Sequence, residues 1–144
     1  RLYISGLPNG IARHTNASVS NAGDGAHALP SQALLDSFTI REMFPDIRGR
    51  RVLIVGDILH SRVARSTSIL MKRLGMEVAY LGPGSLVPRT EYSGIPRFSD
   101  FNEAFAWKPD VIYLLRVQKE RQDAPFFPSA REYNKIYGVT EERQ

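Results

Sequence analysis

The sequence predicts an α/β protein with a doubly wound parallel sheet. Residues 51–56 form a short apolar run bounded by Arg50 and Asp57, which is the pattern of a buried central strand. Residues 110–115 form another buried apolar run, and residues 77–81 read as a strand between the two. Because stretches of helical composition separate these strands, we expect a parallel sheet with helices on its faces.

The helices are predicted from their start and stop signals. Pro30 suits the first turn of a helix, and apolar residues follow it up to a break at Pro45. A second helix follows the loop at residues 57–61 and is stopped by Gly75, a residue type common just past helix C-termini. The remaining expectations are a short helix within 5–14, an extended segment at 17–21, a loop at 21–25, a weaker helix around 100–107 and a capped helix at 129–137.

The composition indicates a globular protein with one main core. The 144 residues are 42% apolar, and the absence of cysteine excludes disulfides and thiolate metal ligands. The apolar runs are far shorter than the roughly 20 residues that cross a bilayer, and the first residues lack the layout of a signal peptide. We therefore expect a soluble, cytoplasmic protein with no membrane partner.

The net charge of +4 is compatible with nucleic acid or with small anionic substrates as ligands. The arginines and lysines are scattered among acidic residues, and the sequence has no stripe of basic and aromatic residues. This distribution favours small anionic substrates and predicts that the protein does not bind nucleic acid.

Two arginines follow strands of the predicted sheet. Ligands of open α/β sheets bind at the carboxyl ends of the strands, and the segments after Val55 and Leu115 carry Arg62 and Arg116. Each planar guanidinium can grip a carboxylate through two N–H groups, so the pair suits a dicarboxylate. The alternative is that each arginine is a surface salt-bridge partner, which is the more common role for such a residue taken alone.

The loop after the strand at 51–56 argues against a dinucleotide site. It contains Gly56 but lacks the second and third glycines of the G-x-G-x-x-G pattern. A generic nucleotide-binding α/β module therefore remains only as an alternative from another functional class, which titration with nucleotides would test.

Three motifs, in the same order along the chain, resemble those of aspartate carbamoyltransferases. They are N-A-G-D-G at 21–25 with P-S-Q-A-L-L-D at 30–36, G-D-I-L-H-S-R-V-A-R-S at 56–66, and L-R-V-Q-K-E-R at 115–121. Because residues 82–89 and 131–143 also fit the family pattern, the resemblance covers almost the whole chain. The R-V-Q-K-E-R run favours the aspartate branch over ornithine carbamoyltransferase, which stays an alternative.

The resemblance implies two domains and a transferase reaction. Residues 1–40 would end a carbamoyl-phosphate-binding domain, and residues 41–144 would form a Rossmann-like aspartate-binding domain that is incomplete at its C-terminus. The family transfers the carbamoyl group of carbamoyl phosphate to the amine of L-aspartate, in de novo pyrimidine biosynthesis, without a metal or organic cofactor. Its members are homotrimers, and the resemblance leaves regulatory or dihydroorotase subunits open as further partners.

The resemblance also implies roles for individual residues. Gln32 would contact the carbamoyl group and act in catalysis. Arg62 and Arg116 would hold the carboxylates of aspartate, and Gln118 would help to orient it. Glu120 would fix Arg116 through an ion pair. The alternatives are a helix-capping or solvent-facing role for Gln32 and a simple surface ion pair for Glu120.

One position of the carbamoyl-phosphate site departs from the family. The family places a histidine immediately before the proline of the helix, where it donates a hydrogen bond to the carbamoyl oxygen, and this chain has Leu29 before Pro30. His27 is the nearest candidate to compensate, although a lone loop histidine is more often a solvated side chain. Leu29 thus favours a second reading, a non-catalytic carbamoyltransferase-like subunit.

Some family motifs have no match in this sequence. The phosphate-gripping S-T-R-T-R loop, the mobile lysine loop and the H-P-G-P segment are missing. We therefore expect an incomplete site and no turnover by these 144 residues alone.

Overall fold

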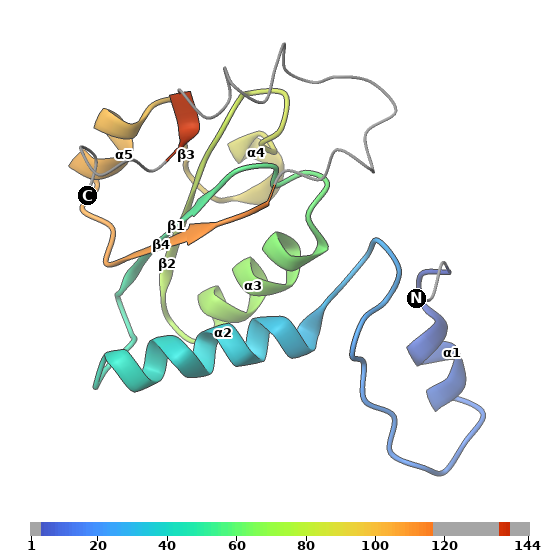
Figure 1. Ribbon diagram of the computed structural model, residues 1–144. Coiled ribbons are helices and arrows are strands. Elements are labelled where there is room, and N and C mark those ends of the chain that lie inside the picture. Colours follow the sequence, from blue (N-terminus) through green and yellow to red (C-terminus); the bar gives the residue numbers. More distant parts are fainter. Residues whose placement is uncertain (1–3, 117–135, 139–144) are drawn as a thin grey trace. The chain divides into compact units, whose positions relative to one another are not determined.

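The computed structural model of the chain describes residues 4–116 and 136–138. Helices and strands alternate along most of this part of the chain (Figure 1). The elements in order are α1 (Leu7–Ala12), α2 (Pro30–Met43), β1 (Arg51–Val55), α3 (Arg62–Arg73), β2 (Glu77–Leu81), α4 (Thr90–Ser93), β3 (Arg97–Phe98), α5 (Phe101–Ala106) and β4 (Val111–Leu114).

The four strands form one parallel sheet in the order β3-β2-β1-β4. β1 pairs with β4 in the register that runs from Val52 opposite Val111 to Val55 opposite Leu114. β1 is an internal strand, and its residues from Val52 to Val55 are no more than 2% exposed, because strands inside parallel sheets are covered on both faces. The predicted parallel α/β fold is confirmed.

The chain divides into two compact units, residues 1–49 with 61–77 and residues 50–60 with 78–144. In the second unit, α5 packs on one face of the sheet. Asp100 caps α5 by accepting hydrogen bonds from the backbone N–H groups of Asn102 and Glu103. The core under the helix consists of Leu53, Val55, Ala79, Leu81, Phe101 and Ala104.

Polar residues join the start of β1 to the start of β4 in the same unit. The backbone N–H of Arg51 donates to the Asp110 carboxylate at 2.8 Å, and the Asp110 N–H donates to the Arg51 carbonyl, also at 2.8 Å. The Arg50 guanidinium donates to the other oxygen of this carboxylate at 2.8 Å. The Arg51 N–H and the Arg50 guanidinium hold the pKa of Asp110 below its usual value, because both favour the ionised form.

The first unit is built on two helices, α2 and α3, which lie side by side (Figure 1). The buried positions of α2 are Ala33, Ser37 and Ile40, whereas Leu34 and Phe38 on its other side are exposed. These buried positions recur at helical spacing, as expected for one covered face of a helix.

α3 has the start and stop signals that the sequence indicates. The Oγ atom of Ser61 accepts a hydrogen bond from the Ala64 N–H and caps the first turn. The helix ends at Arg73, and Gly75 follows in the left-handed region with φ of 86°. This conformation favours glycine, so the predicted stop at Gly75 is confirmed.

Several sequence expectations differ from the structure. The strand predicted as buried at 110–115 is β4, in which Ile112 and Leu114 are 38% and 58% exposed. β4 ends the strand order at one edge, and α5 covers β1 and β2 rather than this strand. The first helix is shorter than the predicted 5–14 segment, and the predicted helix at 129–137 lies outside the described residues except for 136 and 137. Across the described ranges, each helix is too short or too polar to cross a bilayer.

Candidate functional site

The loop before α2 is a tight turn closed by its own backbone. Asp24 and Ala28 form an isolated antiparallel bridge, in which the Asp24 N–H donates to the Ala28 carbonyl at 2.9 Å. The Asn21 Oδ1 atom accepts the Gly23 N–H at 2.9 Å, an Asx turn that shapes the entry to the loop. Gly25 has φ of +53°, a left-handed conformation that favours glycine, within the loop predicted at 21–25.

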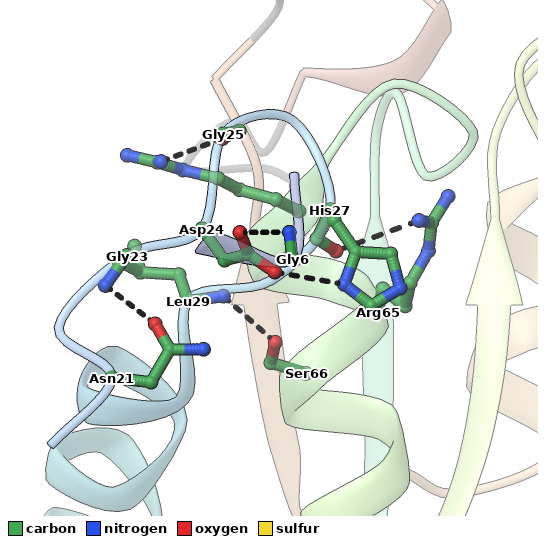
Figure 2. A network of polar contacts seen from close by, with 10 residues as sticks. Gly6, Asn21, Gly23, Asp24, Gly25, His27, Leu29, Arg65 and Ser66 are labelled. Carbon is green, nitrogen blue, oxygen red and sulfur yellow. Dashed lines mark hydrogen bonds and ion pairs between the residues drawn. The ribbon is translucent and has the colours of Figure 1, made fainter. Parts of the chain in front are cut away.

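Asp24 lies at the centre of this loop and is only 4% exposed (Figure 2). Its Oδ1 atom accepts the backbone N–H of Gly6 at 2.7 Å. Its Oδ2 atom lies 3.4 Å from Nδ1 of His27, whose side chain is 62% exposed. The carboxylate thus joins the loop to the start of α1, while His27 covers its outer side.

Side chains of α3 bind backbone atoms on the other side of the loop. The Nη1 atom of Arg62 donates to the Gly25 carbonyl at 2.8 Å. The Oγ atom of Ser66 accepts the backbone N–H of Leu29 at 2.9 Å (Figure 2). Both bonds end on main-chain atoms of the loop, so they hold the path of its backbone irrespective of the loop side chains.

A third contact of the same kind is longer. The Nη1 atom of Arg65 lies 3.4 Å from the His27 carbonyl oxygen (Figure 2). At this length the hydrogen bond is weak. Arg65 therefore supports the loop less than Arg62 and Ser66 do.

The loop leads into α2 at Leu29, which is the N-cap residue of the helix. The Leu29 side chain makes no capping hydrogen bond, and Pro30 occupies the first helical position as predicted. Gln32 follows in the first turn, and its Nε2 atom donates to Asp36 Oδ1 at 2.9 Å. The side chain of Gln32 is therefore held on the surface of α2 by the residue one turn later.

In the second unit, the loop after β1 is fixed by a buried carboxylate. Asp57 is 1% exposed, and its Oδ1 atom accepts the His60 N–H at 3.2 Å and contacts His60 Nδ1 at 2.8 Å. The N–H groups of Ile58 and Leu59 both donate to the Leu86 carbonyl at 3.0 Å. This network gives His60 a structural partner within the loop after β1.

The loop after β2 comes close to the loop after β1 in the same unit. Gly82 is buried, and a Cβ atom placed on it would lie 2.7 Å from the carbonyl oxygen of Gly56. Only glycine fits so close an approach of two backbones.

Comparison with known proteins gives the chain a family. The aspartate carbamoyltransferase catalytic subunit of Akkermansia muciniphila is 92% identical over 143 residues, which are 99% of this chain and 46% of the relative. The chain belongs to the aspartate carbamoyltransferase family. Catalytic subunits of the same name from Endomicrobium trichonymphae and Halothermothrix orenii are 48% and 51% identical, over 99% and 92% of this chain and 46% and 42% of the relatives. No family model matches the chain.

Solved aspartate transcarbamoylases share the fold. The M. jannaschii catalytic subunit superposes with a TM-score of 0.73 at 27% identity, over 93% of this chain and 45% of that chain. The Trypanosoma cruzi enzyme in complex with N-(phosphonacetyl)-L-aspartic acid gives a TM-score of 0.71 at 28% identity, over 85% of this chain and 44% of that chain. The chain thus spans about half the length of the curated relatives that it matches.

The site residues that the sequence motifs predict belong to both units. Gln32, Leu29 and Arg62 belong to the first unit, and the side chains of Leu29 and Arg62 both lie near Gly23, where an added Cβ atom would be 3.3 Å from Leu29 Cδ1 and 3.6 Å from Arg62 Nη1. Arg116 follows β4 in the second unit and is exposed. Residues 118 and 120, which the sequence motif assigns to aspartate binding and support, lie outside the described residues. Their roles, like the pairing of Arg62 with Arg116, stay predictions.

The motifs at 21–25 and 56–66 include Asp24 and Ser66, but sequence reasoning missed the contacts through which these two residues hold the loop before α2. Asp24 was visible only as the turn residue between Gly23 and Gly25, and the sequence gives no sign of its partner Gly6, 18 residues away. Among residues 4–116 and 136–138, no group of three metal-ligating side chains is arranged to hold a metal ion.

Proposed function

We propose that the chain forms part of an active aspartate carbamoyltransferase catalytic chain. The full-length protein transfers the carbamoyl group of carbamoyl phosphate to the amine of L-aspartate and releases N-carbamoyl-L-aspartate and phosphate, a step of de novo pyrimidine biosynthesis. The observation that carries this proposal is the 92% identity to the A. muciniphila catalytic subunit over 143 residues.

The proposed substrate-binding roles follow the two predicted domains of the chain. Residues 1–40 end the carbamoyl-phosphate-binding domain, and residues 41–144 belong to the aspartate-binding domain. Gln32 contacts the carbamoyl group, and Leu29 occupies the position where the family has a histidine. The location of Leu29 at the N-cap and of Gln32 in the first turn of α2 supports this part of the proposal, because helix N-termini favour anions.

Aspartate binding is assigned to four residues. Arg62 and Arg116 hold its carboxylates, Gln118 orients it, and Glu120 fixes Arg116. Arg62 lies in the first turn of α3 and donates to the Gly25 carbonyl, and the planar fork of a guanidinium can serve more than one acceptor at a time. The same side chain can therefore support the loop before α2 and bind a carboxylate.

The proposed reaction depends on orientation and charge. Two anionic reactants must be held together, and negative charge develops on the carbamoyl oxygen as the amine attacks. Such catalysis needs neither a metal nor an organic cofactor. The proposed assembly is a homotrimer of the full-length chain, with regulatory or dihydroorotase subunits as optional partners.

A second candidate function is a non-catalytic carbamoyltransferase-like subunit. The observation that favours it is Leu29, whose side chain offers no hydrogen bond to the carbamoyl oxygen. A third possibility, ornithine carbamoyltransferase, has no observation in its favour, because the relatives reported above are aspartate carbamoyltransferases.

Turnover of the full-length chain tests these alternatives. We expect a colorimetric assay to show carbamoyl-aspartate formation from L-aspartate and no citrulline formation from L-ornithine. The 144-residue chain, which spans 46% of its relative, should show no turnover in the same assay. Absence of both products with a folded full-length chain would favour the non-catalytic subunit, and citrulline as the only product would overturn the substrate assignment.

A further inference from the structure

Asp24 is a buried carboxylate to which the proposed mechanism gives no role. It is 4% exposed, and its Oδ1 atom accepts the Gly6 N–H at 2.7 Å. A carboxylate buried to this degree requires hydrogen-bond donors, because its desolvation is otherwise costly. The short bond to Gly6 supplies one donor from a segment 18 residues earlier in the chain.

Backbone hydrogen bonds around Asp24 connect its contact with Gly6 to the rest of the loop. The Asp24 carbonyl accepts the N–H groups of His27 at 2.8 Å and Ala28 at 3.2 Å. The next residue, Leu29, is bound by Ser66 and begins α2. The carboxylate is therefore connected through one closed turn to the first turn of the helix that carries Gln32.

We propose that Asp24 is a positioning residue of the carbamoyl-phosphate side of the site, which acts through the turn at residues 24–29 on Gln32. This inference rests on the proposed carbamoyltransferase function. Asp24 itself does not touch the substrate: it holds the turn against Gly6 and thereby fixes where α2 begins.

His27 contributes less than Gly6 to holding the Asp24 carboxylate. Its ring lies 3.4 Å from the Asp24 carboxylate and is 62% exposed, and ion pairs at such exposed positions contribute little. Its Nδ1 atom faces Asp24 (Figure 2), so His27 contacts the turn that Asp24 holds.

The test uses the full-length chain and compares Asp24→Ala with Asp24→Asn. Alanine removes the acceptor for the Gly6 N–H, whereas asparagine keeps an oxygen at the same place. We expect Asp24→Ala to lower kcat/KM for carbamoyl phosphate at least 30-fold and Asp24→Asn to lower it less than fivefold. Asp46→Ala is the matched control, since Asp46 also accepts a backbone N–H, from Arg48 at 3.0 Å, but lies in an exposed loop.

A double-mutant cycle with Gln32→Ala separates positioning from stability. If Asp24 acts through Gln32, the double variant should be no more than threefold worse than the poorer single variant. Losses that multiply in the double variant, or a lowered melting temperature with unchanged kcat/KM, would overturn the proposal.

A further variant, Asp24→Glu, provides a test if Asp24→Ala does not fold, because glutamate keeps the charge but displaces the carboxylate. It should still lose at least tenfold in kcat/KM, and full activity of this variant would count against the proposal.

A readout without catalysis distinguishes failure of this proposal from failure of the proposed function. Hydrogen exchange of the full-length chain, followed by mass spectrometry, should be faster for peptides that cover residues 24–33 in Asp24→Ala than in wild type. This increase is expected even if the wild-type chain proves inactive. Unchanged exchange of these peptides in a folded Asp24→Ala variant would show that Asp24 does not position the turn.

Discussion

The backbone N–H of Leu29 donates a hydrogen bond of 2.9 Å to the Oγ atom of Ser66. The bond involves the main chain of residue 29, so it does not depend on the leucine side chain. A histidine at this position would start from the same backbone anchor, at the N-cap of the same helix. The departure from the family at Leu29 is therefore one of side-chain chemistry, on a backbone that is already held in place.

This arrangement predicts a gain of function for Leu29→His. Loss of one hydrogen bond to a developing oxyanion typically costs about 2.7 to 4 kcal/mol of transition-state stabilisation. We expect Leu29→His to raise kcat of the full-length chain at least tenfold with little change in KM for aspartate, because the contact matters mainly as charge develops. Steady-state kinetics provide the measurement. His27→Ala is the control and should change kcat little; if it abolishes activity while Leu29→His has no effect, the loop uses His27 instead.

Gly82→Ala should destabilise the second unit. The added Cβ would lie 2.7 Å from the Gly56 carbonyl oxygen and 3.0 Å from the Val87 side chain. Because the nearest atom belongs to the backbone, the clash cannot be relieved by a rotamer change, and we expect a loss of about 1 to 3 kcal/mol, as for overpacked cores. Urea denaturation measures the change. Gly84→Ala in the same loop is the matched control, since its Cβ would meet no atom within 4 Å, and equal losses in both variants would contradict the explanation.

Thr67→Val should stabilise the first unit. The Thr67 hydroxyl is fully buried on α3 and has no hydrogen-bond partner among the described residues. Valine keeps the shape and removes the unsatisfied polar group, which we expect to raise the free energy of unfolding by about 1 kcal/mol. Ser68→Ala provides the contrast, because the Ser68 hydroxyl donates to the Ala64 carbonyl at 2.6 Å. It should not stabilise the protein, and a thermal melt in which Thr67→Val lowers the midpoint would refute the prediction.

Asp110 should make folding stability depend on pH in the acid range. Its pKa is lowered from the ordinary value of 3.8 by the Arg51 N–H and the Arg50 guanidinium. The unfolded chain therefore binds a proton at a higher pH than the folded chain, and stability falls as the pH drops below 3.8 towards the folded pKa. In Asp110→Asn this contribution is absent, so the free energy of unfolding should change less between pH 5 and pH 2 than in wild type. Asp46→Asn is the control for a general charge effect, and an unchanged slope in Asp110→Asn would exclude the proposed cause.

The strands of the sheet were predictable because their signal is local. β1 and β2 are short apolar runs with polar ends, and both occur where the sequence places them. β3 was missed because two residues, Arg97 and Phe98, give no periodic pattern, and its pairing with β2 depends on the path of the chain. The exposure of β4 also escaped sequence reasoning, since a run of apolar residues does not tell an internal strand from an edge strand.

The residue types of the candidate site were predictable from the sequence, whereas the contacts that hold the site in place were not. Gly23, Gly25 and Pro30 carry conformational signals that the sequence shows directly. The contacts of Asp24 with Gly6 and of Leu29 with Ser66 join residues 18 and 37 positions apart, so they depend on how the elements pack. No local pattern specifies such partners.

Arg51 and Asp110 form two hydrogen bonds with each other although they lie 59 residues apart in the chain. The Arg51 N–H donates to the Asp110 carboxylate, and the Asp110 N–H donates to the Arg51 carbonyl. In a parallel sheet, a slip of one residue turns every side chain of a strand to the opposite face. A slip of β4 against β1 would separate the Asp110 carboxylate from the Arg51 N–H and would also take Ile112 out of line with Leu53. The hydrogen bonds between these two polar residues therefore favour the correct register of β4 against β1 over a register shifted by one residue.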